Sequence, residues 1–437
     1  MKKHAISLFF LFVTVLAFGQ ETKTISLQEA FQLAAQNSKQ LKLDSLKKES
    51  LSIKKQQTQN AMFPVLGLTS AYTRLSNNIE PFSISVPGLG SMALNPQILN
   101  QFVNRFSVQQ PIFQGLRNWN NLKAIKLQNT AADFDILKDN QDLKWNIVQT
   151  YYNLYKLQQT SNLLDSTIAQ TQVRINDLIK FKKEGLILNN DVMRAELQKT
   201  NLLVSLADVE SNIETLNYNL NILLGLGGNT KLIVSDIPGM ATYIAISGDY
   251  NQAFAGRPEL NALDYKNKAA AYQVKAAKSA YMPTINFVGN GYYNNPNQRV
   301  FPQENKFKAT WDIGVSVSWN IMQAYTAKAV VNESKNQKLQ LENAIAQAKE
   351  GIQMEVNANL KAYQVTQMKI DLAQKAIEQA KENKRILNNR FNAQLALLND
   401  VLEADILLLQ AQTTLLNAQA DQAIAYYKLQ KSLGEIK

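Results

Sequence analysis

The sequence repeats itself. Residues 26–437 hold two copies of one pattern, in which helix-like sequence gives way to a pair of strand-like segments and then to a long helical hairpin. Matching landmarks lie at nearly constant separation: Leu41 and Leu260 are 219 residues apart, and Asp191 and Asp400 are 209 apart. The separation shrinks because one loop between paired strands is about ten residues longer in the first copy. A duplicated unit of strands and very long helices indicates a structural, mechanical role rather than a catalytic domain.

Proline marks where the helices can lie. All ten prolines fall within residues 64–111 and 238–302, which leaves residues 112–237 and 303–437 without one. Proline costs about 3 kcal/mol inside a helix. The two proline-free runs are therefore where we expect long helices.

Each proline-free run is interrupted once, at Gly185 in the first and near Gln394 in the second. We predict descending helices over residues 115–182 and 322–391, each on the order of 100 Å long at about 1.5 Å per residue. The ascending helices that follow carry small and apolar residues at alternating steps of three and four, which predicts coiled-coil packing. This seam includes Val192, Ala195, Leu202, Leu206 and Val209, and in the second copy Val401, Ala404, Leu408 and Ala411.

A period of two replaces the helical period in four short segments. Apolar and polar residues alternate strictly in residues 310–321, and Trp311 and Trp319 stand on the apolar side. Eight residues of a tilted strand span roughly 20 Å, close to the separation of the two aromatic girdles of a transmembrane β-barrel. A soluble sheet with one buried face is the alternative interpretation. The four predicted strands cover residues 64–75, 103–113, 284–293 and 310–321.

Four strands cannot close a barrel. Open strand edges in lipid would leave backbone groups without hydrogen-bond partners. Two copies of the chain would give eight strands, too few for a conducting lumen, whereas three copies give twelve strands and twelve helical passes. The predicted fold class is therefore mainly α with a small β part: long antiparallel coiled-coil helices form a periplasmic α-barrel, and four strands per chain contribute to a trimeric twelve-stranded transmembrane β-barrel.

The N-terminus predicts secretion. Residues 1–19 resemble a signal peptide, with Lys2 and Lys3 before an apolar run of about fourteen residues, too short for a spanning membrane anchor. Its removal takes away His4, the sole histidine of a chain without cysteine. Triads, thiol nucleophiles and the usual zinc sites are then unavailable, so we predict no catalytic residue, cofactor or metal site. The net charge of +11 is spread over helices with many acidic residues, which favours solvated faces over nucleic-acid binding.

Several motifs resemble the TolC-type outer-membrane efflux family. They are LQEAFQLAAQNSKQL near the start, AMFPVLGLTSAY and AYMPTINFVGNGYY entering the strands, and the turns KKEGLILNNDVMRAELQ and RFNAQLALLNDVLEADILLLQ. The resemblance implies a homotrimeric outer-membrane exit duct with a large periplasmic portion. The duct would export small toxic compounds or secreted proteins in a tripartite efflux or type I secretion system. It would act with a periplasmic adaptor protein and an inner-membrane pump, docking at the tips formed by Gly185, Leu186, Gln394 and Leu395.

The resemblance also assigns two sets of tip residues. In the family an Arg and a Tyr near the second turn lock the closed tip to an Asp of the first turn. Asp191 matches that Asp, but Ala396 and Phe391 stand at the Arg and Tyr positions, so the ion-pair lock is in doubt. Asp400 and Glu403 match the narrowest point of the family's pore and would form stacked acidic rings. Helix capping by Asp400 and a favourable helix-dipole contact by Glu403 are the alternative explanation.

The predicted organisation follows from these observations. It comprises a signal peptide (1–19), a first repeat (20–225), a linker (226–250) and a second repeat (251–437). The strand pairs lie at 64–113 and 283–321, and the hairpin tips lie near 182–191 and 391–400. By the resemblance, the linker and the two termini would form a girdle around the helices. The rival functions are a secreted coiled-coil structural or adhesive protein and an envelope enzyme that uses carboxylates alone. We predict that the chain is not an enzyme.

Overall fold

The helices and strands fall into two units in the computed structural model, which describes residues 22–78, 83–88, 90–93, 97–235 and 250–436. The predicted signal peptide and residues 236–249 of the predicted linker lie outside the described residues. The first unit comprises the described residues up to Lys42, Lys138–Arg257 and those from Gly351 onward, and the second comprises Leu43–Leu137 and Pro258–Glu350. The helices over residues 117–183 and 321–392 each cross a boundary between the units, and each unit combines segments of both repeats.

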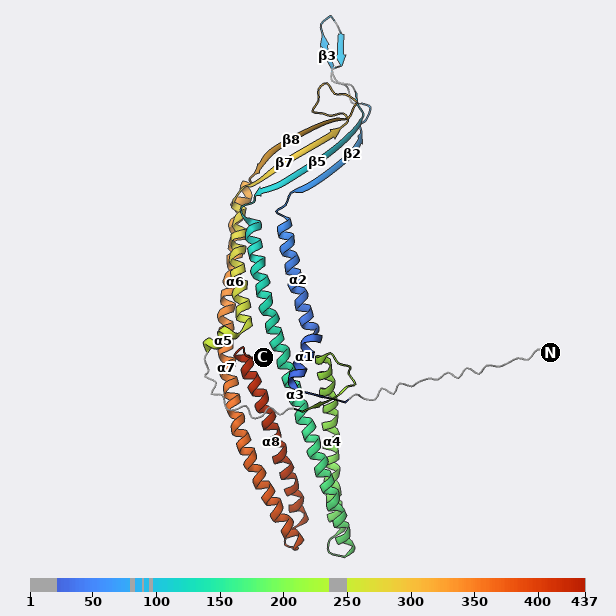
Figure 1. Cartoon of the computed structure of the whole chain (residues 1–437), viewed down its shortest axis with the longest axis vertical. Helices are drawn as coiled ribbons and strands as arrows, with labels where there is room; N and C mark the ends of the chain where they lie inside the picture. The colour runs from blue at the N-terminus through green and yellow to red at the C-terminus, as the bar shows by residue number, and fades with distance from the viewer. Residues whose placement is uncertain (1–21, 79–82, 89, 94–96, 236–249, 437) are drawn as a thin grey trace, which may run out of the picture. The chain divides into compact units, whose positions relative to one another are not determined.

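The second unit holds a four-stranded antiparallel sheet (Figure 1). Its spatial order is β2 (Val65–Arg74), β5 (Asn100–Phe113), β7 (Thr284–Asn294) and β8 (Lys308–Ser318). The strand pair of the first repeat therefore lies beside the pair of the second repeat, and the four strands predicted from the sequence are present in one sheet. A small hairpin of β3 (Ser83–Val86) and β4 (Gly90–Ala93), which the sequence did not predict, lies within the longer loop of the first repeat.

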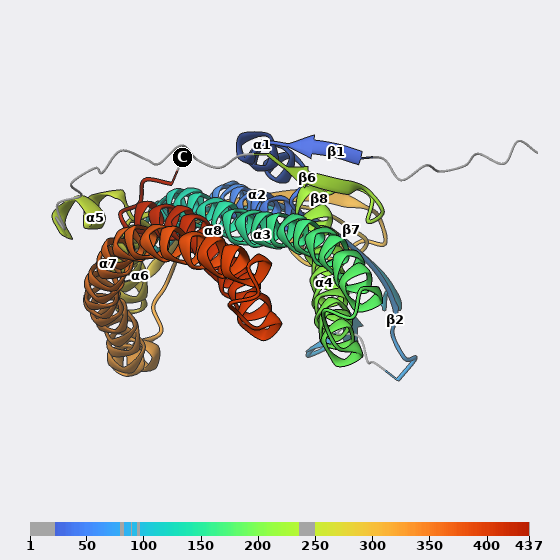
Figure 2. The same cartoon turned by 90° about the horizontal axis from the view of Figure 1, so that it is seen from below.

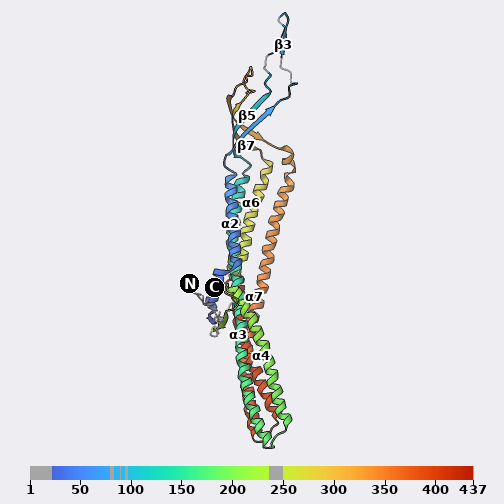
Figure 3. The ribbon, with the colours of Figure 1, turned by 90° about the vertical axis from the view of Figure 1, so that its right-hand side faces the viewer.

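Helices flank one end of this sheet. The first part of α3 (Arg117–Lys183) runs beside α2 (Lys39–Asn60) and α6 (Pro258–Ala277) (Figures 1 and 3). An ion pair between Lys48 and Asp133 joins α2 to α3 (2.6 Å), and the stacked rings of Phe134 and Tyr265 join α3 to α6. The short 3-10 turn η1 (Lys278–Tyr281) then leads into β7.

The first unit holds two helical hairpins, seen from below in Figure 2. One is formed by α3 and α4 (Asn189–Leu224), and the other by α7 (Ile321–Asn392) and α8 (Leu398–Ser432). The boundaries of α3 and α7 lie within two residues of the predicted helices, and the prediction of long helices is confirmed. In the part of the chain that is described, no helix combines the length and apolarity that crossing a membrane requires.

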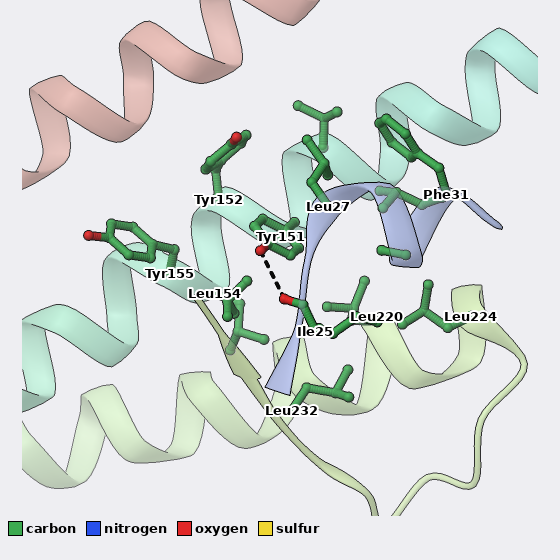
Figure 4. Packing of buried hydrophobic residues seen from close by; sticks show 14 of the residues in the cluster. Ile25, Leu27, Phe31, Tyr151, Tyr152, Leu154, Tyr155, Leu220, Leu224 and Leu232 are labelled. Carbon is green, nitrogen blue, oxygen red and sulfur yellow. Dashed lines mark hydrogen bonds between the residues drawn. The ribbon is translucent and has the colours of Figure 1, made fainter. Parts of the chain in front are cut away.

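The main core of the first unit gathers segments that are far apart in sequence. It contains β1 (Thr22–Ile25), α1 (Leu27–Asn37), the middle of α3, the end of α4 and β6 (Lys231–Val234). Figure 4 shows the fully buried hydroxyl of Tyr151 donating to the backbone carbonyl of Ile25 (3.0 Å) among Leu220, Leu224 and Leu232.

The parallel pairing of β1 with β6 was not predicted. It brings the N-terminal segment and the start of the linker together on the helices. On the other side of residues 236–249 the chain resumes in α5 (Tyr250–Gly256).

Candidate functional site

The two hairpin tips have the same backbone turn. Gly185 has φ of 76° and Gln394 has φ of 61°, and both lie just after a long helix. In each turn, the amide of the following residue donates to the carbonyl five residues earlier (2.9 Å and 2.7 Å), and the amide at the positive-φ position donates to the carbonyl three residues earlier (3.0 Å and 2.9 Å). This pair of bonds is the Schellman motif, which usually places glycine at the left-handed position. The second repeat makes the same turn with glutamine.

Exposed leucines cover both tips. Leu186 and Leu188 of the first tip and Leu395 and Leu397 of the second are all more than half exposed. The predicted docking residues therefore lie at the surface, together with two leucines that the sequence did not single out. Apolar side chains exposed on a hydrogen-bonded turn are suited to contact with a partner protein.

Asp191 and Asp400 have equivalent capping roles. Oδ2 of Asp191 accepts from the amide of Leu188 (3.2 Å), and Oδ2 of Asp400 accepts from the amide of Leu397 (3.3 Å). Each carboxylate thus binds the backbone at the start of an ascending helix, where a negative charge is also favoured by the helix dipole. Asp400 therefore caps α8 through Oδ2, and its other carboxylate oxygen takes no part in the cap.

Glu403 lies one turn after Asp400 on α8 and is exposed. The spacing of three residues places both carboxylates on one side of the helix. The structure thus keeps together the two residues predicted for the pore constriction.

The predicted tip lock is not an ion pair in this chain. Ala396 carries no charge, so Asp191 cannot pair with it, and Asp191 instead caps its own helix. Phe391 packs against an apolar cluster at the tips. This cluster joins all four helices and consists of Ile175, Leu178, Val192, Ala195, Leu398 and Leu402, with Phe181, Ile187 and Phe391 at its border. The two hairpins are therefore held together by apolar packing near their tips.

A buried carboxylate adds an ionic link between the hairpins. Asp405 of α8 has a side chain only 10% exposed, and it pairs with Arg174 of α3 (3.1 Å) and Lys384 of α7 (2.9 Å). Arg174 also donates to the side-chain amide of Asn388 (3.1 Å). The sequence did not predict this cluster. The one feature that could have indicated it is a charged residue, Asp405, directly after the coiled-coil seam residue Ala404.

Further polar contacts join α3 and α8 away from the tips. Lys156 pairs with Asp421, and Lys431 pairs with Asp142 (2.5 Å). Burial opposes ionisation of Asp142, but hydrogen bonds from Lys138 and Lys431 outweigh it and hold the pKa of Asp142 below its usual value. The hydrogen bond to Asp142 is the main cause that raises the pKa of Lys138 to about 12.

The sheet of the second unit has one strongly apolar exposed face. Directly paired residues lie on the same face of a sheet. Phe106 of β5 pairs with Gly291 of β7, and Gly291 pairs with Trp311 of β8, so these three residues lie on one face. Trp311 is 73% exposed, and Trp319, just beyond β8, is 56% exposed. The other large apolar residues exposed on this face include Leu66, Leu68, Tyr72, Phe102, Phe106, Phe287, Tyr293, Ile313, Val315 and Val317. An exposed apolar face of this size marks an interaction surface.

A set of aromatic contacts lies at the end of this sheet remote from the helices. Phe102 contacts Tyr72 (centroids 4.8 Å apart) and Phe307 (5.6 Å), and Phe307 stacks on Tyr293 (5.1 Å). Aromatic rings in such a band are typical of the boundary between lipid and water. Among the described residues, no group of three or more His, Cys, Asp or Glu side chains is placed to hold a metal ion.

Comparisons with known proteins agree with this geometry. Residues 250–435 match the family model described as "Outer membrane efflux protein". The outer membrane efflux protein BepC of Brucella suis biovar 1 (strain 1330) is 23% identical over 351 residues, which cover 75% of this chain and 71% of BepC. Together they confirm the predicted resemblance to outer-membrane efflux proteins and the outer-membrane location that it implies.

Two solved structures have the same fold. One is the outer membrane protein VceC of Vibrio cholerae, with a TM-score of 0.77 and 18% identity over 93% of this chain and 96% of VceC. The other is the CmeC outer membrane channel of Campylobacter jejuni, with a TM-score of 0.78 and 18% identity over 94% of this chain and 86% of CmeC. The fold likeness thus extends over both repeats.

Proposed function

We propose that three copies of this outer-membrane efflux protein form a single channel, with a twelve-stranded barrel in the outer membrane that opens into a helical tunnel in the periplasm. The observation that carries the proposal is the four-stranded sheet: its edge strands β2 and β8 each have one partner within the chain, and one of its faces is apolar and exposed. In lipid, an open edge leaves backbone groups without hydrogen bonds. Pairing of β8 with β2 of the next copy removes every edge when three sheets close into a ring.

The alternation of the strands supports the orientation of the barrel. The face with Trp311 and Trp319 would meet lipid, and the opposite face, with Ser316 and Ser318 on β8, would line an aqueous lumen. This orientation accounts for large exposed apolar side chains in a chain whose mean hydropathy is −0.23.

The hairpin tips would dock with a periplasmic adaptor and its inner-membrane pump. The exposed Leu186 and Leu395 support contact at the tips. Asp400 and Glu403 would line the constriction, since Asp400 caps α8 through one oxygen only. The cargo would be small toxic compounds or secreted polypeptides, carried by the tripartite efflux or type I secretion system that the channel completes.

The absence of cysteine from the sequence permits a direct test of the closed ring. Single cysteines introduced in pairs along β2 and β8, at Leu66 and Val317 and at successive neighbours, should form disulfides between chains for at least one register. The products on a denaturing gel should reach three chains and stop there. A detergent-stable mass of three chains is the parallel expectation.

A mass of one or two chains in mild detergent would overturn the proposal, as would cross-linking that continues beyond three chains. Extraction without detergent would instead favour a secreted coiled-coil protein, because only a lipid-facing sheet requires detergent.

A further inference from the structure

A network of charged and aromatic side chains crosses the polar face of the sheet. Arg105 on β5 donates from Nε and Nη2 to Oδ1 of Asn290 on β7 (3.0 and 2.7 Å), and Asn290 donates to Asp312 on β8 (2.7 Å). The registers pair Arg105 with Tyr292 and Asn290 with Asp312, so these residues share the face opposite Trp311.

The loop between β7 and β8 completes this network with Arg299. Its guanidinium lies over the ring of Tyr292 (4.2 Å to the centroid) and forms an ion pair with Asp312 (2.6 Å). The buried side chain of Asn297 fixes the loop, because it donates to the carbonyl of Lys308 (2.8 Å) and accepts from the amide of Arg299 (3.0 Å). Arg299 is therefore held across the polar face rather than free in solvent.

The charges of this network do not balance. On the polar face of the described strands, the charged residues are Arg105, Lys308 and Asp312. Lys308 pairs with Glu304 (2.6 Å), and Asp312 pairs with Arg299. Arg105 is bonded to a neutral amide oxygen, so one positive charge per chain remains at this level. Its exposed guanidinium retains donors for a further anionic acceptor.

We propose that Arg105, beside the Tyr292–Arg299 stack, forms an anion-binding layer on the lumen wall that engages phosphate- or carboxylate-bearing organic anions as they leave the barrel. This inference rests on the proposed function, because the polar face lines a lumen only in the closed trimer. Three copies would place three such guanidinium groups around one axis, and multivalent anions would bind best. The β7–β8 loop lies at the sheet end remote from the helices, so the layer would lie near the outer mouth.

Planar-bilayer recordings with tripolyphosphate added on the side of the outer mouth test the layer. Tripolyphosphate should block the wild-type channel, and in the Arg105→Gln variant the half-blocking concentration should rise about tenfold, since up to three charge-assisted contacts are lost. Arg105→Lys should restore most of the block, because it retains the charge. The matched control is Arg74→Gln, which removes the same charge from the opposite face of the same sheet, where Arg74 donates to Asn100 (2.9 Å).

Calorimetric titration of the same detergent-solubilised variants with tripolyphosphate measures anion binding independently of the current through the channel. The inference is overturned if Arg105→Gln binds and is blocked like the wild type, or if Arg74→Gln weakens both readouts equally, which would indicate general surface charge. Failure of the proposed function has a different signature, namely a wild-type protein of fewer than three chains that conducts no current.

Discussion

Arg174 and Asp405 form a largely buried ion pair (Nη2 to Oδ2, 3.1 Å) that joins the first helical hairpin to the second. Lys384 adds a second cation on the other oxygen of Asp405 (2.9 Å). The family's lock at the tip cannot form here, because Ala396 stands where its Arg would be. The Asp405 cluster is an ionic connection between the hairpins close to the tip packing.

Asp405→Asn should loosen the two hairpins. The substitution leaves Arg174 and Lys384 without their carboxylate, which should lower the free energy of unfolding by about 2 kcal/mol per chain, allowing for partial exposure of both cations. Reconstituted channels should also show higher conductance or more frequent opening. The control is Asp421→Asn, which breaks the more exposed pair with Lys156 and should cost less than about 1 kcal/mol. Equal effects of both substitutions on conductance would exclude a specific role of Asp405.

Gln394→Gly should stabilise the second tip. A non-glycine residue with φ of 61° costs on the order of 1 kcal/mol relative to glycine. Hydrogen exchange of the backbone amides around the turn should slow severalfold in the variant. Gly185→Gln is the reciprocal change and should accelerate exchange at the first tip, where no neighbouring atom obstructs an added Cβ. The turn conformation would not be the controlling factor if both variants exchanged like the wild type.

Asp142→Asn should destabilise the protein at neutral pH, and the destabilisation should shrink as the pH falls below the pKa of an unfolded aspartate. The pKa of Asp142 is lowered in the folded state, so its stabilising contribution is present above the pKa of an unfolded aspartate and is lost as the pH falls through the folded-state pKa. We expect less than about 1 kcal/mol, because 38% of the Asp142 side chain is exposed and solvent screens its pairing. Melting temperatures of both proteins in detergent, measured over a falling pH series, test this, and a deficit that does not change with pH would indicate lost packing instead.

Single-tryptophan variants should separate lipid-facing from protein-facing rings. Brominated lipid should quench Trp311 and Trp319, which lie on the exposed apolar face. Trp145 is the internal control, because it packs against the core of the first unit and should be insensitive. Insensitivity of all three would favour a soluble sheet whose apolar face is covered by protein.

Replacement of Asp400 and Glu403 by Asn and Gln should lower cation selectivity in planar bilayers and weaken block by trivalent cations from the periplasmic side. The side chain of Asn at position 400 retains an oxygen that can accept from the amide of Leu397, so capping of α8 is preserved while the charge is removed. If selectivity were unchanged in an intact trimer, Asp400 would act only as a helix cap and Glu403 only through the helix dipole.

The sequence by itself determined the periodic features of this protein. Proline exclusion and the interruptions at Gly185 and near Gln394 located α3 and α7 within two residues, because these constraints act between neighbours in the chain. The alternation in residues 310–321 likewise located β8 and its apolar face. The turn equivalence of Gly185 and Gln394 was visible as a repeat offset, although only the backbone revealed that glutamine adopts the left-handed conformation.

Tertiary structure decided which distant residues meet. The ion pairs of Asp405, the parallel pairing of β1 with β6 and the placement of Arg299 over Tyr292 join residues separated by many turns of helix or by a loop. No period encodes these contacts, since each depends on how separate elements pack and on which charges burial forces to pair. The sequence thus specified the helices and strands, and the packing of those elements specified the ionic connections between the hairpins and the charge of the polar face.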